Sequence, residues 1–148
     1  MIFSNILMVC VGNICRSPTA EYLLKQQLQQ KGSKASVASA GLGALVDKPA
    51  APKAIELAEA LHLDLTPHRA QQLTRELIKP YDLVLVMEQA HIKAVEAVAP
   101  ESRGKVHLLG RWQQNVEIPD PYQKGIAAYQ LALALIQTTT AQWAQKLI

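Results

Sequence analysis

The sequence Ile6-Leu7-Met8-Val9-Cys10-Val11-Gly12-Asn13-Ile14-Cys15-Arg16-Ser17-Pro18 determines how the rest of this chain is organised. Its four apolar residues, Ile6–Val9, are typical of a parallel strand that is covered on both faces. A helical pattern begins directly after Ser17 and Pro18. We expect Pro18 to be the first helical residue, where no N–H is needed, and Ser17 to be the N-cap. The stretch therefore predicts a strand, a tight loop and a helix in direct succession.

Such a loop has the features of a phosphate site. A helix N-terminus offers inward-pointing N–H groups and the positive end of a helix dipole, and successive N–H groups in a tight loop form an anion nest. Gly12 is expected to permit the turn, and the planar guanidinium of Arg16 can bind two phosphate oxygens. Further contacts to the phosphate are predicted from the other loop residues, which are Val11, Gly12, Asn13, Ile14, Cys15 and Ser17.

Cys10 lies at the start of this loop and is the candidate nucleophile. The N–H groups that attract phosphate also favour a thiolate, which is the reactive form of cysteine. Attack on phosphorus would give a phosphocysteine that water then cleaves, and the Ser17 hydroxyl is close enough in sequence to donate a hydrogen bond to the thiolate. The alternative is a buried structural cysteine with Arg16 on the surface. The strand before Cys10 and the helix after Pro18 favour the functional interpretation over a chance Cys-x5-Arg spacing.

A phosphate ester also needs a proton for its leaving group. Asp120, in Glu117-Ile118-Pro119-Asp120-Pro121-Tyr122, is the best candidate for this general acid. The two flanking prolines stiffen the loop, so that the carboxyl group can be held in one direction. The alternative is an ordinary loop aspartate, or the N-cap of the last helix.

These residues resemble a known family. Cys10–Glu21 is similar to the signature of low-molecular-weight protein tyrosine phosphatases, and Asp120-Pro121-Tyr122 is similar to their general-acid loop. Ser39–Leu42 and Asp82–Met87 also match. The resemblance covers essentially the whole chain, and it is strongest to bacterial members that act with a tyrosine autokinase in capsule or exopolysaccharide production.

The resemblance implies a role for each matching residue. Cys10 would be the nucleophile, Arg16 would bind the phosphoryl group, and Asp120 would be the general acid and later the base. The expected supporting residues hold the loop in shape or stabilise the thiolate: Asn13, Ser17 and Ser39. The better-known eukaryotic members carry paired aromatic residues after the acid loop and an aromatic at the entrance, whereas here Tyr122 is followed by Gln123 and an aliphatic stretch surrounds Leu45. Leu45 and Tyr122 are accordingly expected to line the substrate site.

The implied substrate is a phosphotyrosine protein, specifically a bacterial tyrosine autokinase, and the product is inorganic phosphate; no cofactor is predicted. An arsenate reductase-like oxyanion enzyme is an alternative, but it needs further cysteines in a distal segment, and both cysteines here lie in the loop. A non-catalytic phosphate-binding module is a second alternative, which leaves Asp120 unexplained. A Walker-type nucleotide site is excluded because no Gly-Lys-Ser/Thr follows the loop.

Composition limits the other classes of function. The chain has 148 residues, of which 49% are hydrophobic and 18% charged, and we expect one globular domain over residues 1–148. A net charge of +3 without a basic cluster, and only 5% aromatic residues, argue against nucleic-acid binding. The N-terminus lacks a basic segment of the signal-peptide type, and no apolar run is long enough to insert into a membrane. The expected location is therefore the cytoplasm, where thiols stay reduced.

The remaining pattern alternates strands and helices. Strands are predicted at Val37-Ala38, Leu83–Val86 and Lys105–Leu108, and helices after Pro18, from Pro52, at Thr74–Lys79, at Ala90–Val98 and, as the strongest periodic signal, at Ile126–Leu147. The fold class is α/β: a doubly wound, three-layer domain with a central four-stranded parallel sheet and the phosphate-binding loop after the first strand. Ligands of such sheets bind at the carboxyl ends of the strands, which is where Cys10 lies.

A few other residues leave alternatives open. Cys15 is either a small filler residue or a redox guard that forms a disulfide with Cys10. The four histidines, His62, His68, His91 and His107, show no helical metal-ligand spacing, so no metal site is predicted. Trp112 is favoured as a loop anchor over a docking residue.

Overall fold

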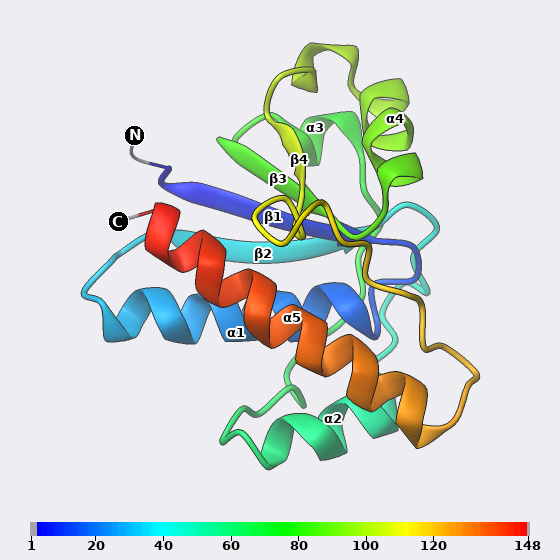
Figure 1. The fold of residues 1–148 in the computed structure, drawn as a ribbon. Helices are drawn as coiled ribbons and strands as arrows, with labels where there is room; N and C mark the ends of the chain where they lie inside the picture. Colours follow the sequence, from blue (N-terminus) through cyan, green and yellow to red (C-terminus); the bar gives the residue numbers. More distant parts are fainter. Residues whose placement is uncertain (1–2, 148) are drawn as a thin grey trace.

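The computed structural model describes residues 3–147, which form a sheet of four strands flanked by helices (Figure 1). In chain order the elements are β1 (Asn5–Cys10), α1 (Arg16–Gln30), β2 (Ser36–Gly41), α2 (Pro52–Glu59), α3 (Arg75–Ile78), β3 (Leu83–Val86), α4 (Gln89–Val98), a 3₁₀ turn at Pro100–Ser102, β4 (Val106–Leu108) and α5 (Ile126–Lys146).

All strand pairs are parallel, and the strand order is β2-β1-β3-β4. The predicted α/β fold with a four-stranded parallel sheet is therefore confirmed. In the register, Val9 of β1 pairs with Ala40 of β2 and with Val86 of β3. The three strands thus end beside one another, and the loops that follow Cys10, Gly41 and Val86 emerge at the same edge of the sheet.

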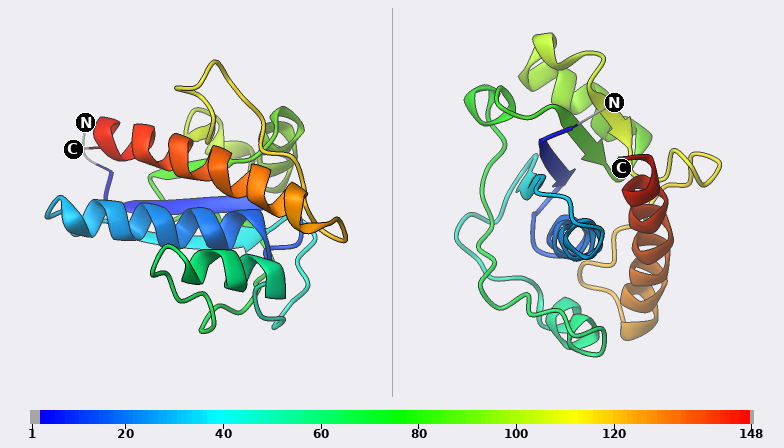
Figure 2. Two further views of the ribbon diagram at one scale, coloured as in Figure 1. Left: turned by 60° about the horizontal axis from the view of Figure 1, so that its bottom comes forward. Right: turned by 90° about the vertical axis from the view of Figure 1, so that its left-hand side faces the viewer.

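Helices cover both faces of the sheet, which explains why β1 is apolar and buried from Ile6 to Cys10. Side chains of a strand alternate between its faces, and Ile6 and Met8 pack in one apolar cluster with α1 and α5, whereas Leu7 and Val9 pack in a second cluster with α3 and α4. Figure 2 shows this layering, with α1 seen end-on in its right-hand view and α2 outside α1 and α5. No exposed face is left for a polar residue in this part of β1.

The start of α1 differs from the prediction. The helix begins at Arg16, with Cys15 as N-cap and no side-chain cap, so that Pro18 is its third residue rather than its first. Pro18 is tolerated there because the first four N–H groups of a helix have no acceptor within the helix. Ser17 is not the N-cap; its hydroxyl makes hydrogen bonds inside the loop instead.

The strand β2 is longer than the predicted Val37-Ala38. Its sequence, Ser36–Gly41, is rich in small residues and carries little strand signal of its own, but all six of its residues pair with β1. Pairing with a neighbouring strand therefore extends it beyond its local preference.

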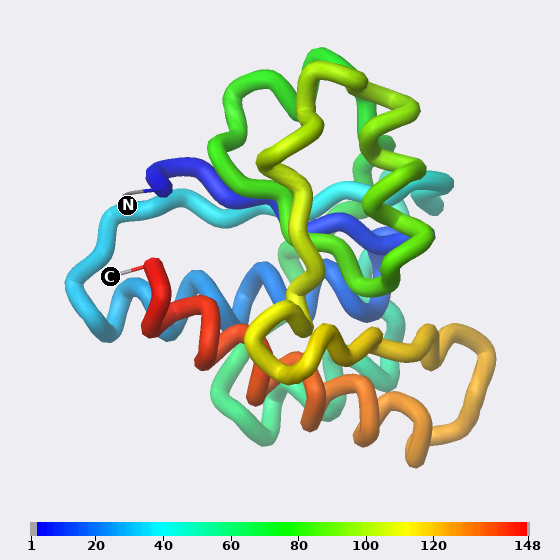
Figure 3. The backbone as a smooth tube through the Cα atoms, turned by 45° about the horizontal axis from the view of Figure 1, so that its top comes forward, coloured from blue at the N-terminus to red at the C-terminus, as the bar shows by residue number. Residues whose placement is uncertain are grey.

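A long irregular segment joins β4 to α5 and runs from the sheet to the N-terminal end of α5 (Figure 3). Trp112 in this segment packs edge-to-face against Trp143 of α5, with ring centroids 5.5 Å apart, as expected for a loop anchor. Within residues 3–147, no helix is both long and apolar enough to cross a membrane. In the same range, histidine, cysteine and acidic side chains form no cluster of three or more that could hold a metal ion.

Candidate active site

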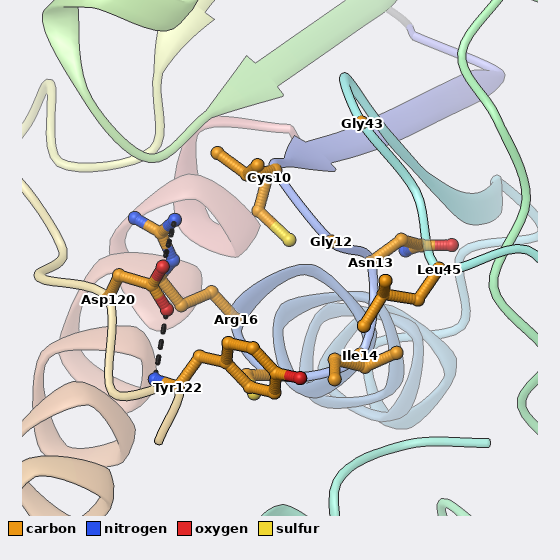
Figure 4. A pocket seen from close by; sticks show the side chains of 11 residues that line it. Cys10, Gly12, Asn13, Ile14, Arg16, Gly43, Leu45, Asp120 and Tyr122 are labelled. Carbon is orange, nitrogen blue, oxygen red and sulfur yellow. Dashed lines mark hydrogen bonds and ion pairs between the residues drawn. The ribbon is translucent and has the colours of Figure 1, made fainter. Parts of the chain in front are cut away.

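The loop between β1 and α1 forms the floor of a cavity of about 140 Å³. Cys10, the last residue of β1, lies at its base and is 2% exposed. Figure 4 shows the Cys10 side chain directed into this cavity, with Arg16 and Asp120 on one side and Leu45 on the other. The predicted site residues that line the cavity come from three separate parts of the chain: Cys10, Val11, Gly12, Asn13, Ile14, Cys15 and Arg16, then Leu45, then Asp120 and Tyr122.

The sharp turn of the loop is made by Asn13, not by Gly12. Asn13 has a φ of 59°, in the left-handed region, whereas the glycines with positive φ among residues 3–147 are Gly32 and Gly104. Asparagine tolerates this conformation better than most residues because its short side chain forms local hydrogen bonds. The expectation that Gly12 supplies the turn was therefore wrong.

Asn13 is completely buried, and each polar part of its side chain is bonded. Its Nδ2 donates to Ser17 Oγ at 2.8 Å and to Ser39 Oγ at 3.0 Å, and its Oδ1 accepts from the Gln71 N–H at 2.9 Å. Its backbone carbonyl is 2.6 Å from Nε2 of the buried His68. These contacts hold the loop through the protein's own side chains and main chain, which is what a preorganised anion site requires.

The same contacts determine where the hydroxyl protons point. Ser39 accepts from Asn13 and is 2.6 Å from Glu21 Oε1, which can only accept as a carboxylate, so that its O–H donates to Glu21. Ser17 accepts from Asn13 and lies 2.9 Å from Cys10 Sγ. Its O–H is therefore free to donate to the sulfur, and a negatively charged thiolate is the form that gains most from this bond.

Arg16 is held by groups that the sequence did not indicate. Its side chain is 2% exposed, and Nη1 donates to Glu88 Oε2 at 2.5 Å and to the carbonyl of Ile118 at 2.9 Å. Glu88 lies just after β3, at the same sheet edge as Cys10. Ligands of parallel sheets bind at this edge. The position of an acidic residue just after β3 was therefore the sequence signal that could have identified Glu88 as a residue of the site.

Replacing Glu88 with Gln is expected to lower kcat/KM for a phosphotyrosine peptide about tenfold. The amide can still accept a hydrogen bond but loses the charge that orients the buried guanidinium. The matched control is Glu117→Gln, because Glu117 lies nearby and bonds the Gln89 N–H at 2.7 Å without touching Arg16. Steady-state kinetics would measure both variants, and equal effects in the two would contradict this role of Glu88.

Asp120 lies in the segment before α5, with 47% of its side chain exposed. Its Oδ1 accepts the Tyr122 N–H at 3.0 Å, and its Oδ2 is 3.7 Å from Arg16 Nη2. The carboxyl group is therefore turned toward the guanidinium at the rim of the cavity. The alternative that Asp120 caps the last helix is wrong, because α5 begins at Ile126 with Gly125 as its N-cap.

The walls above the loop are apolar. Leu45 and Tyr122 are 39% and 43% exposed and face one another across the mouth of the cavity, and Ile14 lies between them (Figure 4). An aromatic ring entering along this path would contact hydrocarbon on both sides while its phosphate reached the N–H groups of the loop.

Cys15 points away from the cavity floor, toward α5. Its Sγ is 3.4 Å from the hydroxyl of Tyr129, and the side chain is 6% exposed. Burial raises the pKa of the Cys15 thiol to about 11, so that it stays protonated at neutral pH. Both cysteines are free thiols, and the redox-guard role of Cys15 stays a prediction.

Limited treatment with iodoacetamide near neutral pH is expected to modify Cys10 and to spare Cys15. Only about one Cys15 in ten thousand is ionised four pH units below its pKa, because each unit lowers the thiolate fraction tenfold. Mass spectrometry of the peptides would measure both sites, with added phosphate as a control that protects Cys10 alone. Modification of Cys15 at the rate of Cys10 would contradict this prediction.

Comparison with known proteins agrees with this geometry. The family described as "Low molecular weight phosphotyrosine protein phosphatase" matches residues 5–148. The low molecular weight protein-tyrosine-phosphatase Wzb of Escherichia coli K12 is 50% identical over 145 residues, which cover 98% of this chain and 96% of that protein.

Solved structures show the same likeness. Vibrio vulnificus Wzb in complex with benzylphosphonate superposes with a TM-score of 0.93 at 45% identity, covering 97% of this chain and 99% of that one. YwlE arginine phosphatase, in a variant with a phosphorylated active-site serine, superposes with a TM-score of 0.91 at 32% identity, covering 97% and 95%. The resemblance predicted from the sequence is confirmed: the chain belongs to the low molecular weight phosphotyrosine protein phosphatase family and is a low molecular weight protein-tyrosine phosphatase.

Proposed function

We propose that the chain hydrolyses phosphotyrosine through a phosphocysteine, with Cys10 as nucleophile, Arg16 as phosphate ligand and Asp120 as general acid and base. One observation carries this assignment. The three side chains come from positions up to 110 residues apart, yet all line one cavity whose floor is a strand-to-helix loop. A thiol, a fixed guanidinium and a carboxyl group are the three parts that two-step ester hydrolysis needs.

In the first step the Cys10 sulfur forms a bond to phosphorus, and the bond from phosphorus to the tyrosine oxygen breaks. Asp120 gives its proton to that oxygen, so that tyrosine leaves as a neutral phenol. The equatorial oxygens of the phosphoryl group bind Arg16 and the loop N–H groups, which stabilise the charge that spreads over them in the transition state.

In the second step a water molecule attacks phosphorus and loses its proton to Asp120. The sulfur–phosphorus bond breaks, inorganic phosphate leaves, and Cys10 returns as a thiolate. The Ser17 hydroxyl, 2.9 Å from the sulfur, stabilises that thiolate as a leaving group. The residues that support the loop in both steps are Asn13, Ser17 and Ser39.

The apolar mouth favours tyrosine over the other phosphorylated side chains. The relative YwlE is an arginine phosphatase, so that phosphoarginine is the competing substrate. A guanidinium carries several N–H donors, and Leu45, Ile14 and the ring of Tyr122 offer apolar surface at the entrance. Transfer from water to such apolar walls costs less free energy for an aromatic ring than for a polar guanidinium group.

The physiological substrate that we propose is a bacterial tyrosine autokinase of capsule or exopolysaccharide production. We propose that the reaction takes place in the cytoplasm and that residues 1–148 act as a single domain. The likeness to the Wzb phosphatases supports this assignment. We propose no cofactor or metal, no nucleic-acid partner and no membrane insertion.

The test is phosphate release from one peptide synthesised with phosphotyrosine, phosphoserine or phosphoarginine, between about pH 5 and pH 8. We expect turnover of the phosphotyrosine peptide, with kcat/KM at least about a hundredfold above the others. Preferred hydrolysis of phosphoarginine would overturn the substrate assignment. Phosphate binding without release from any peptide would instead favour the non-catalytic binding module. Loss of phosphotyrosine from a purified, phosphorylated autokinase would test the partner.

A further inference from the structure

A second, larger cavity opens from the mouth of the catalytic one. It has a volume of about 860 Å³ and shares Ile14, Leu45 and Tyr122 with the catalytic cavity. Its other walls are residues 48–53, the exposed side of α2, and Gln123 with Tyr129. We call this cavity the flanking groove. Because the phosphotyrosine ring must pass between Leu45 and Tyr122, the main chain that bears it has to leave along an adjoining surface, and the flanking groove begins there.

The flanking groove is not uniformly charged. Lys48 and Lys53 line it and are exposed. The Lys53 side chain reaches from α2 toward the segment that joins Asp120 to α5. Its Nζ is 3.4 Å from the carbonyl of Lys124 and 5.8 Å from the centre of the Tyr129 ring. Two further exposed residues of α2, Glu56 and Glu59, line the same groove with the opposite charge.

The direction of α2 orders these charges along the groove. The Ala51 N–H, just before α2, donates to the carbonyl of Ile14 at 2.8 Å, which ties the N-terminal end of the helix to the phosphate loop. Lys53 therefore lies near the catalytic cavity. Glu59 is six residues further along α2, or about 9 Å at the rise of an α-helix. The charge thus changes from positive to negative with distance from Cys10.

We propose that the flanking groove binds the substrate polypeptide on one side of the phosphotyrosine, and that it selects acidic residues next to the phosphotyrosine followed by a basic residue about three positions further on. An extended chain covers 9 Å in about three residues, which matches the spacing from Lys53 to Glu59. The proposal rests on the proposed phosphotyrosine hydrolysis and adds a preference for substrate sequence to it.

Three phosphotyrosine peptides of equal length test the proposal. The matched peptide has glutamates beside the phosphotyrosine and lysines beyond them, on both sides; the swapped peptide exchanges the two charges; the neutral peptide has serine at these positions. In each enzyme variant, kcat/KM is divided by the value for phenyl phosphate, which has no flanking residues. Using both sides removes any dependence on the direction in which the chain lies.

For the unmodified enzyme we expect a matched-to-swapped ratio of about ten at low salt, because several exposed charge pairs each contribute modestly. Raising NaCl from about 50 mM to about 500 mM should reduce the ratio toward one, since salt screens exposed charges. Lys53→Glu should bring the ratio to about one or below. The matched control is Lys34→Glu, which makes the same charge change at an exposed position between α1 and β2, at the opposite end of the sheet.

The reciprocal variant Glu56→Lys tests the distal half of the groove. It should lower the matched-to-swapped ratio, because the distal lysines of the matched peptide then meet a positive charge. A ratio near one in the unmodified enzyme, or equal effects of Lys53→Glu and Lys34→Glu, would overturn the proposal while leaving phosphotyrosine hydrolysis intact. No hydrolysis of any of the three peptides would instead contradict the proposed function itself.

Discussion

Cys10→Ser is expected to lower kcat for phosphotyrosine hydrolysis by at least about a thousandfold, because a serine hydroxyl is hardly ionised at neutral pH and is a poor nucleophile without a base. The substitution changes one atom, and the hydrogen bonds that fix the loop through Asn13 do not involve the sulfur. Binding of phosphate should therefore survive while turnover is lost.

Two measurements separate these effects. Rapid acid quenching of the unmodified enzyme should trap phosphate covalently on Cys10, and the serine variant should show none within the same time. The control is the rise in unfolding temperature on adding phosphate, which any ligand of the folded state produces and which should be similar in both proteins. Residual turnover above about one part in a hundred in the variant would contradict the role of the Cys10 sulfur as nucleophile.

Asp120→Asn is expected to lower kcat for a phosphotyrosine peptide by about a hundredfold to a thousandfold, the usual contribution of a positioned general acid. Asparagine can keep the bond from the Tyr122 N–H through its own Oδ1, so the loop should hold its shape. The loss should be smaller for p-nitrophenyl phosphate, because that leaving group departs readily without a proton.

The comparison of the two substrates is the measurement that identifies the acid. Asp47→Asn is a matched control, because Asp47 is also an exposed loop aspartate and its φ of 65° suits asparagine equally well. Equal losses for the peptide and for p-nitrophenyl phosphate would indicate that Asp120 acts on phosphate binding rather than on the leaving group.

The elements with local signals were predictable from the sequence. The apolar runs of β1 and β3 identify strands that are buried on both faces. The spacing of Ile126–Leu147 identifies a long helix that covers one face of the sheet. Together they fix the order of layers and place Cys10 at the edge where ligands bind. The proposed nucleophile, phosphate ligand and general acid follow because each has a chemical role that few residue types can fill.

The supporting groups were not predictable in the same way. Glu88, His68 and Gln71 reach the loop only because the sheet brings segments far apart in the chain to one edge. The position of Glu88 just after β3 indicates the sheet edge at which it lies, but not its contact with Arg16, which spans 72 positions. The left-handed conformation of Asn13 likewise depends on buried partners beyond its own neighbours, whereas a glycine beside it carries the stronger local signal.

Arg16 also serves as a structural tie for the segment that carries the acid. Its Nη1 binds the carbonyl of Ile118, two residues before Asp120, and the Ile118 N–H bonds the carbonyl of Met87 at 2.9 Å. Loss of the guanidinium would remove the proposed phosphate ligand and release one anchor of the proposed acid at the same time. In a double-mutant cycle, Arg16→Ala and Asp120→Asn should therefore be strongly non-additive, with the double variant losing less activity than the product of the single losses. We therefore expect phosphate recognition and protonation of the leaving group to be energetically coupled through a single side chain.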